Sequence, residues 1–209
     1  MPSPAPIAII DFETTGMSPA YGDRPTEVAI VMTERGRVVD HFQSLMNPGR
    51  PRPGFITQLT GITNAMVRSA PPVATVMADA ARFVGATPLA AHNASFDRKF
   101  WQAELASLGL DNTQPFVCTV LLSRRLYPQA PNHKLGTLVE HLALSREGRA
   151  HRALSDAQVT AALLGRIQDD LATSHGLADA GHEVLAGLQL CSRAAVTGWL
   201  RQRAAVGHH

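Results

Sequence analysis

Two carboxylates one residue apart, Asp11 and Glu13, follow the apolar run at residues 7–10. A Thr-Thr-Gly sequence comes next, so the pattern predicts a buried strand that leads into a turn. Because side chains alternate along a strand, Asp11 and Glu13 point to one face and Phe12 to the other. Neighbouring carboxylates repel each other, and Mg²⁺ or Mn²⁺ is the partner that oxygen ligands favour. A strand end that exposes its charges to water is the simpler alternative.

Two further aspartates fall where helices are expected to begin. Residues 89–97 predict a short strand and then a helix capped by Ser95, which places Asp97 in the first helical turn. Residues 151–156 open a long amphipathic helix with Asp156 near its start. A helix N-terminus favours an ionised carboxylate, so both aspartates can bind a metal. For each one alone, an acidic residue that only stabilises a helix start is the simpler explanation.

Together, the motifs at residues 11–16, 92–97 and 151–156 resemble those of the DEDDh family of 3′–5′ exonucleases. This family includes the proofreading epsilon subunit of DNA polymerase III and RNase T. Residues 59–63 and 134–138 are also similar, and the likeness spans roughly residues 5–172. A sister branch carries tyrosine in place of the histidine, but Tyr21 and Tyr127 lie elsewhere. The implied catalytic set is Asp11, Glu13, Asp97, Asp156 and His151.

The resemblance implies a ribonuclease H-like α/β fold, with a mixed sheet flanked by helices, and two divalent cations, Mg²⁺ or Mn²⁺. Asp11, Glu13 and Asp156 would hold the first cation, with Asp11 bridging to the second. Asp97 would act through bound waters. His151 would be the general base, because an imidazole with its ordinary pKa of about 6.5 is mostly neutral at pH 7–8. A phosphate contact or a plain loop residue is the alternative for His151.

Residues beside the motifs are candidates for contacts with the nucleotide. Leu59 and Ile62 flank a glycine and, as in the family, would stack on terminal bases or wedge between them. Phe96 fits either a base platform or the core, while His92 and Asn93 either orient the site or terminate a strand. The turn after Glu13 has small side chains that let backbone amides approach a nucleotide. The candidate substrate-binding set is Phe12, Thr14, Thr15, Gly16, Leu59, Ile62, His92, Asn93 and Phe96.

Length and composition fit one globular domain. The chain has 209 residues, of which 45% are hydrophobic, and no stretch approaches the length of a membrane span. The N-terminus lacks the basic and then apolar order of a signal peptide. Cys118 and Cys191 form no metal-binding pattern, which favours free thiols in a reducing cytoplasm. We interpret residues 207–209 as the remnant of a purification tag.

The positive charge is concentrated ahead of the third motif. The whole chain carries a formal charge of +2, whereas residues 120–152 contain six Lys or Arg and two acidic residues. Such a segment would attract a phosphodiester backbone. A solvated helix and loop surface explains the pattern equally well.

The remaining segments predict the frame around the motifs. Residues 26–32 and 38–45 form a hairpin that turns at Gly36, and Glu27 within it is taken as a structural acid. Helices are expected over residues 73–84, 120–126 and 135–142, with an extended loop around residues 48–53. Residues 1–175 would form the exonuclease domain. Residues 176–206 would add one or two helices packed on it, with a dimer or partner surface as the alternative.

The sequence therefore predicts a metal-dependent 3′–5′ exonuclease that releases nucleoside 5′-monophosphates and favours single-stranded DNA ends. RNA trimming within the same family is one alternative. A non-catalytic nucleic-acid-binding or scaffold module is another, and the intact five-residue set argues against it. The expected partners are DNA or RNA with a 3′ end and, because proofreading needs a polymerase, a DNA polymerase subunit. No membrane partner is expected, and the oligomeric state is open.

Overall fold

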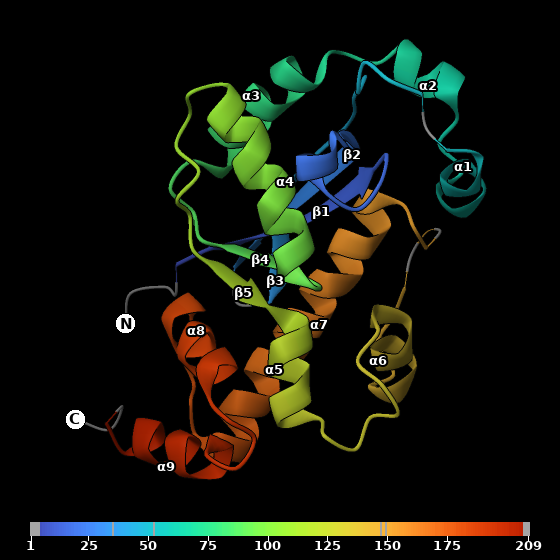
Figure 1. The fold of residues 1–209 in the computed structure, drawn as a ribbon. Helices are drawn as coiled ribbons and strands as arrows, with labels where there is room; N and C mark the ends of the chain where they lie inside the picture. Colours follow the sequence, from blue (N-terminus) through green and yellow to red (C-terminus); the bar gives the residue numbers. More distant parts are fainter. Residues whose placement is uncertain (1–4, 35, 52, 147, 149, 207–209) are drawn as a thin grey trace.

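A computed structural model describes residues 5–34, 36–51, 53–146, 148 and 150–206. The predicted tag remnant at 207–209 lies outside these residues. A mixed five-stranded sheet in the order β3-β2-β1-β4-β5 has helices on both faces (Figure 1). β2 pairs antiparallel with both β1 and β3, whereas β4 runs parallel to β1 and β5 runs parallel to β4. The strands are β1 (Ile7–Thr14), β2 (Pro25–Glu34), β3 (Arg37–Leu45), β4 (Leu89–Ala91) and β5 (Phe116–Cys118).

The helices of the described residues follow the chain in three groups. A short 3-10 helix, η1 (Pro19–Tyr21), and the small helices α1 (Gly54–Thr60) and α2 (Asn64–Arg68) lie before and after the hairpin. The larger helices are α3 (Val73–Val84), α4 (Ala94–Ser107), α5 (Thr119–Leu126), α6 (Leu135–His141) and α7 (Ala153–His175). Two C-terminal helices, α8 (His182–Leu190) and α9 (Val196–Val206), complete the chain.

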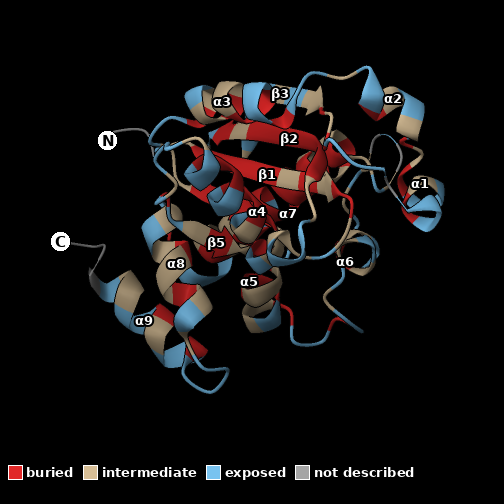
Figure 2. Cartoon of the chain, turned by 45° about the horizontal axis from the view of Figure 1, so that its top comes forward, coloured by how far each residue is buried: buried red, intermediate tan, exposed pale blue. Residues whose placement is uncertain are grey.

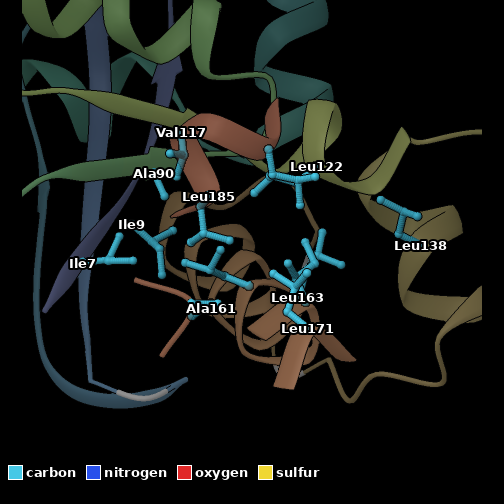
Figure 3. Close-up of a cluster of buried hydrophobic side chains, with 14 of the residues drawn as sticks. Ile7, Ile9, Ala90, Val117, Leu122, Leu138, Ala161, Leu163, Leu171 and Leu185 are labelled. Atoms are coloured by element: carbon cyan, nitrogen blue, oxygen red, sulfur yellow. The ribbon is translucent and has the colours of Figure 1, made fainter. Parts of the chain in front are cut away.

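Alternating residues of β1 divide the core into two layers. Ile7 and Ile9 face a cluster formed with α5, α7 and α8, shown in Figure 3. Ala8, Ile10 and Phe12 face the opposite cluster, formed with α3 and α4. The strands β1 and β2 are buried along most of their length, whereas α1 and α2 carry much exposed surface (Figure 2). The end of β1 therefore lies between two helical layers.

The hairpin is held close to α7 by a contact between two glycines. Gly36 has φ +72°, and a Cβ atom placed there would lie 2.8 Å from the Cα atom of Gly165 in the middle of α7. Only glycine fits both the left-handed backbone conformation and this close approach. The turn that the sequence predicts at Gly36 thus also fixes how β2 and β3 sit on the helix that carries Asp156.

Residues 176–206 pack against the same layer as α7. Leu185, Leu188, Val196 and Leu200 are buried in that cluster. Burying one such side chain contributes on the order of 1.5–3 kcal/mol, so this packing stabilises the domain. Among the described residues, no helix combines the length and apolar character needed to cross a membrane.

One local expectation is wrong, and some short elements were not predicted. Ser95 does not cap α4: Asn93 occupies the cap position in a left-handed conformation (φ 68°), and Ser95 lies in the first turn. The chain after the predicted loop at residues 48–53 folds into α1 and α2, two helices too short to show a full apolar period. The strand β5 was not predicted, because three residues are too few to reveal alternation.

Candidate active site

The carboxylates of β1 lie on the face that α7 covers. Glu13 is the direct partner of Glu27 across β1 and β2, and the strand register shifts immediately after Glu13. Phe12 points the other way and is buried against Phe100 of α4, with ring centroids 6.5 Å apart. The strand predicted from the sequence therefore orients Asp11 and Glu13 as expected.

Asp97 reaches the same place from α4, on the other side of the sheet. Its side chain is buried, and its Oδ1 accepts a hydrogen bond of 3.1 Å from the backbone N–H of Phe12. This bond joins the first turn of α4 directly to the strand that carries Asp11 and Glu13. The predicted position of Asp97 in the first helical turn is confirmed.

Asp156 lies in the first turn of α7, as predicted, and both of its carboxylate oxygens are engaged. Its Oδ2 accepts from the backbone N–H of His151 at 2.9 Å, and its Oδ1 accepts from Arg146 at 3.0 Å. His151 is exposed and has φ 60°, so it stands in a tight left-handed turn just ahead of the helix. The bond to Asp156 therefore fixes the backbone from which the imidazole projects.

The carboxylates of the site are buried close to one another, which disfavours their ionised forms. Burial raises the pKa of Asp11 well above its usual range, and the charges of Asp97, Glu13 and Asp156 raise it further. Burial likewise raises the pKa of Asp97 to about 7, although the hydrogen bond from Phe12 lowers it. Such crowding is relieved when a cation binds, because positive charge favours the ionised carboxylates.

The side chains present fit a divalent cation. One ligand atom each from Glu13, His151 and Asp156 lies within 4.8 Å of the other two. Carboxylate oxygens and an imidazole nitrogen form a donor set that Mn²⁺ accepts, and the carboxylates alone suit Mg²⁺. The raised pKa of Asp11 beside this group supports the same conclusion.

A cavity of about 310 Å³ opens onto these residues. Its polar side carries the five predicted catalytic residues: Asp11, Glu13, Asp97, His151 and Asp156. Its apolar side includes Phe55, Leu59 and Phe96. Phe96 lines the cavity while its ring packs 5.1 Å from that of Phe100, so it contributes to both the cavity and the core. This arrangement places a surface for a flat apolar group next to a site for a charged one.

The cavity also includes most of the predicted substrate-binding residues. Phe12, Thr14, Gly16, Leu59, His92, Asn93 and Phe96 line it. Thr15 and Ile62 are buried and do not. The backbone N–H of Thr15 donates to the carbonyl of Arg24 at 2.9 Å, so this amide is already used within the turn. Ile62 is completely buried, and packing therefore replaces the wedge role that the family resemblance implied.

His92 orients the end of β4. Its Nε2 lies 3.1 Å from the carbonyl oxygen of His133 and its Nδ1 lies 2.9 Å from Oγ1 of Thr119. Because a carbonyl only accepts, Nε2 carries the proton and Nδ1 accepts from the hydroxyl. Burial lowers the pKa of His92 to about 4, which keeps the ring neutral. Of the two alternatives for His92, the contacts favour orientation of the site.

Three residues at the site escaped the sequence interpretation. Met17 and Phe55 line the cavity and are each 70% exposed, an unusual state for large apolar side chains. Their position after predicted turns and prolines was the only available signal. Arg146 was counted in the basic segment, but nothing in the sequence indicated its ion pair with Asp156.

Comparison with known proteins gives consistent results. A family model described as exonuclease, the RNase T family, matches residues 8–164. PolC-type DNA polymerase III of Bacillus subtilis (strain 168) is 38% identical over 166 residues, covering 78% of this chain and 11% of the polymerase. The corresponding protein of Latilactobacillus sakei subsp. sakei (strain 23K) is 39% identical over 174 residues, covering 83% and 12%. The chain therefore spans only about a tenth of these polymerases.

Solved structures with the same fold include two nucleases with bound nucleic acid or nucleotide. Exonuclease X in complex with 5′ overhanging duplex DNA superposes with a TM-score of 0.65 and 31% identity, covering 78% of this chain and 91% of that one. The nuclease domain of 3′hExo, a DEDDh family member bound to rAMP, gives a TM-score of 0.67, with 24% identity and coverage of 80% and 93%. The second likeness concerns the fold alone. Both share the ribonuclease H-like arrangement of a mixed sheet between helices.

Proposed function

The chain belongs to the exonuclease family, in its DEDDh branch of 3′–5′ exonucleases, and on this premise we propose that it hydrolyses single-stranded DNA from the 3′ end. The proposed products are nucleoside 5′-monophosphates. The observation that carries the proposal is the convergence of all five candidate catalytic residues on one cavity with an apolar side.

Each part of this cavity has a role in the proposed reaction. Phe55, Leu59 and Phe96 offer apolar surface on which a terminal base stacks, and stacking accepts every base. The phosphate next to that base would then face Glu13, His151 and Asp156, whose ligand atoms lie within 4.8 Å of one another. A cavity of about 310 Å³ suits one terminal nucleotide, which favours removal from an end over internal cleavage.

The hydrolysis requires a water nucleophile and neutralisation of charge at phosphorus. Two bound divalent cations would supply both. Asp11, Glu13 and Asp156 are the residues that would hold them, with Asp97 acting through waters. His151 would accept the proton of the attacking water, and its backbone bond to Asp156 keeps it beside the candidate metal ligands.

A second cavity supports a path for the rest of the strand. It measures about 870 Å³ and shares His92, Asn93, His151 and Asp156 with the first. Arg124, Lys134 and Arg146 also line it, so it continues the site with basic side chains. Their charge would attract successive phosphates without selecting a base sequence. The basic segment predicted from residues 120–152 thus borders the site, and its use as a backbone path is part of the proposal.

DNA is the proposed substrate because the relatives at 38–39% identity are DNA polymerases and Exonuclease X was solved with duplex DNA. RNA is the alternative, favoured by the fold neighbour that holds rAMP. By analogy with the PolC-type polymerases, we also propose a DNA polymerase as a partner of this chain. Residues 176–206 would then remain part of the exonuclease domain as packing helices.

Parallel digestions test the proposal. The substrates are 5′-labelled single-stranded DNA, single-stranded RNA, blunt duplex DNA and duplex DNA with a mispaired 3′ end, each with Mn²⁺, Mg²⁺ or chelator. We expect stepwise shortening from the 3′ end, fastest on single-stranded DNA and absent with chelator. If RNA is digested faster than DNA, RNA becomes the proposed substrate. Binding without cleavage would support the non-catalytic alternative. Internal nicking of circular single-stranded DNA would refute exonuclease action.

A further inference from the structure

Glu27, a buried acid of the sheet, lies beside the candidate metal ligands without belonging to them. It sits on β2, is completely buried, and is the cross-strand partner of Glu13. Directly opposed side chains on paired strands have Cβ atoms about 4.5–5.5 Å apart, so Glu27 lies next to Glu13. A buried carboxylate is costly unless charged and hydrogen-bonding groups compensate it.

Glu27 is compensated almost entirely by the start of α7. Arg152 donates to both of its oxygens, from Nε at 3.2 Å and from a terminal nitrogen at 2.8 Å. The backbone N–H of Ala153 donates to Oε2 at 3.1 Å. Gln43 of β3 donates to Oε1 at 2.9 Å. These four bonds lower the pKa of Glu27 despite its burial, so the carboxylate is ionised at neutral pH.

The anchored residues are the immediate neighbours of the catalytic candidates. His151 directly precedes Arg152, and the backbone N–H of Asp156 donates to the carbonyl of Arg152 at 3.0 Å. The bonds that Arg152 and Ala153 donate to Glu27, called the clamp below, therefore fix the point from which both His151 and Asp156 extend toward Glu13. It also fixes the positive charge of Arg152. Glu27 holds this guanidinium by hydrogen bonds, and the negative charge of Glu13 attracts it as well.

We infer that Glu27 is a positioning residue of the exonuclease site with two effects. It anchors the start of α7, so that His151 and Asp156 face Glu13, and it holds the Arg152 guanidinium away from Glu13. Without Glu27, the carboxylate of Glu13 would attract the Arg152 guanidinium, which would then compete with a divalent metal ion for Glu13. This inference rests on the metal site proposed above.

A purely structural ion pair is the competing explanation, and the chain provides a matched control for it. Arg24 donates to both oxygens of Glu104 at 2.6 and 2.8 Å, and the side chain of Glu104 is only 5% exposed. Glu104→Gln therefore breaks a buried, two-pronged pair of the same kind that does not contact the start of α7.

The test compares Glu27→Gln, Arg152→Gln, the double variant and Glu104→Gln. Three quantities are measured for each protein. Calorimetry gives the affinity of the metal-free protein for Mn²⁺, a digestion assay gives kcat on single-stranded DNA at saturating metal, and thermal unfolding gives Tm with chelator. Partners that orient metal ligands are typically worth about 10–100-fold in affinity or activity. Glu27→Gln should weaken Mn²⁺ binding and lower kcat on that scale. Arg152→Gln should also lower kcat, but it should weaken Mn²⁺ binding less than Glu27→Gln does, because no guanidinium remains to compete.

The double variant separates the two effects. It should regain the part of the Mn²⁺ affinity that competition by the guanidinium removes in Glu27→Gln, while kcat stays low because the anchor is gone. The double variant leaves neither Glu27 nor Arg152 as an unpaired charge, so the anchor can still be tested with it if Glu27→Gln does not fold. Glu104→Gln should lower Tm only. The inference is overturned if Glu27→Gln behaves like Glu104→Gln, or if the double variant binds Mn²⁺ no more tightly than Glu27→Gln. Absence of Mn²⁺ binding to the wild type would instead refute the proposed metal site.

Discussion

Metal removal should make the stability of this protein fall as pH rises, and Asp97 sets the magnitude. Burial raises the pKa of Asp97 from 3.8 to about 7. A raised acid pKa means that the folded state binds more protons than the unfolded chain between these values. Stability is therefore present below pH 3.8 and is lost as pH rises toward 7. At about 1.4 kcal/mol per pH unit, Asp97 alone accounts for about 4 kcal/mol.

Two neighbours decide the window in which to measure this. The pKa of Asp11 is raised by the same burial and by Asp97, so Asp11 adds to the loss of stability. Glu27 has a lowered pKa and acts in the opposite direction, but only below its ordinary value of 4.5. Between pH 5 and 8 the metal-free protein should therefore lose stability continuously. Bound metal should offset the loss, since a ligand at a hundredfold excess over Kd adds about 2.7 kcal/mol.

The assay is thermal unfolding at pH 5–8 with chelator or with millimolar Mn²⁺. The wild-type Tm should fall with pH in chelator and should be restored by Mn²⁺. Asp97→Asn keeps an oxygen to accept from the Phe12 N–H but removes the charge, so it should flatten the fall. Asp40→Asn, at an exposed position on β3, is the control and should leave it unchanged. A flat wild-type profile in chelator, or an equal fall in Asp97→Asn, would refute the charge-crowding argument.

Three further outcomes are expected. Asp11→Asn and Asp156→Asn should each abolish cleavage with the fold retained by circular dichroism; near wild-type turnover would remove that residue from the site. His151→Ala should lose about 10²–10⁴-fold in kcat and also lose the fall in activity at acidic pH, whereas an unchanged acidic limb would exclude it as the base. Gly36→Ala should destabilise the protein by more than Gly49→Ala in urea unfolding, because both have φ near +70° but only Gly36 contacts α7. Equal losses would show that the contact with α7 contributes nothing.

Much of the fold could be predicted because its long elements have clear periods. The alternation in β1, the hairpin around Gly36 and the helical faces of α3 and α7 are all visible in the sequence. The same alternation correctly assigned Asp11 and Glu13 to one face. The family resemblance supplied the grouping of the three motifs, since nothing local to Asp97 or Asp156 indicates that they meet.

The remainder depended on tertiary contacts that have no sequence period. Nothing in the sequence indicated that Ile62, between α1 and α2, is completely buried while Phe55 of α1 is exposed at the cavity. The αL cap at Asn93 lets the chain turn sharply from β4 into α4, a geometry that outweighed the usual preference for a serine cap. Ion pairs such as Arg146 with Asp156 join residues through a loop whose path the sequence does not determine.

The way the site is built explains why its parts should differ in tolerance to change. Asp97 reaches the end of β1 from α4, and Asp156 reaches it from α7 on the opposite face. Both are therefore positioned by buried helices, and small shifts of either layer would separate the carboxylates. His151 differs, because it is exposed in a left-handed turn and depends on its bond to Asp156 and on the clamp at Arg152. Core mutations should therefore impair metal binding by separating the carboxylates, whereas changes at Glu27 and Arg152 should act on both His151 and Asp156 through the start of α7.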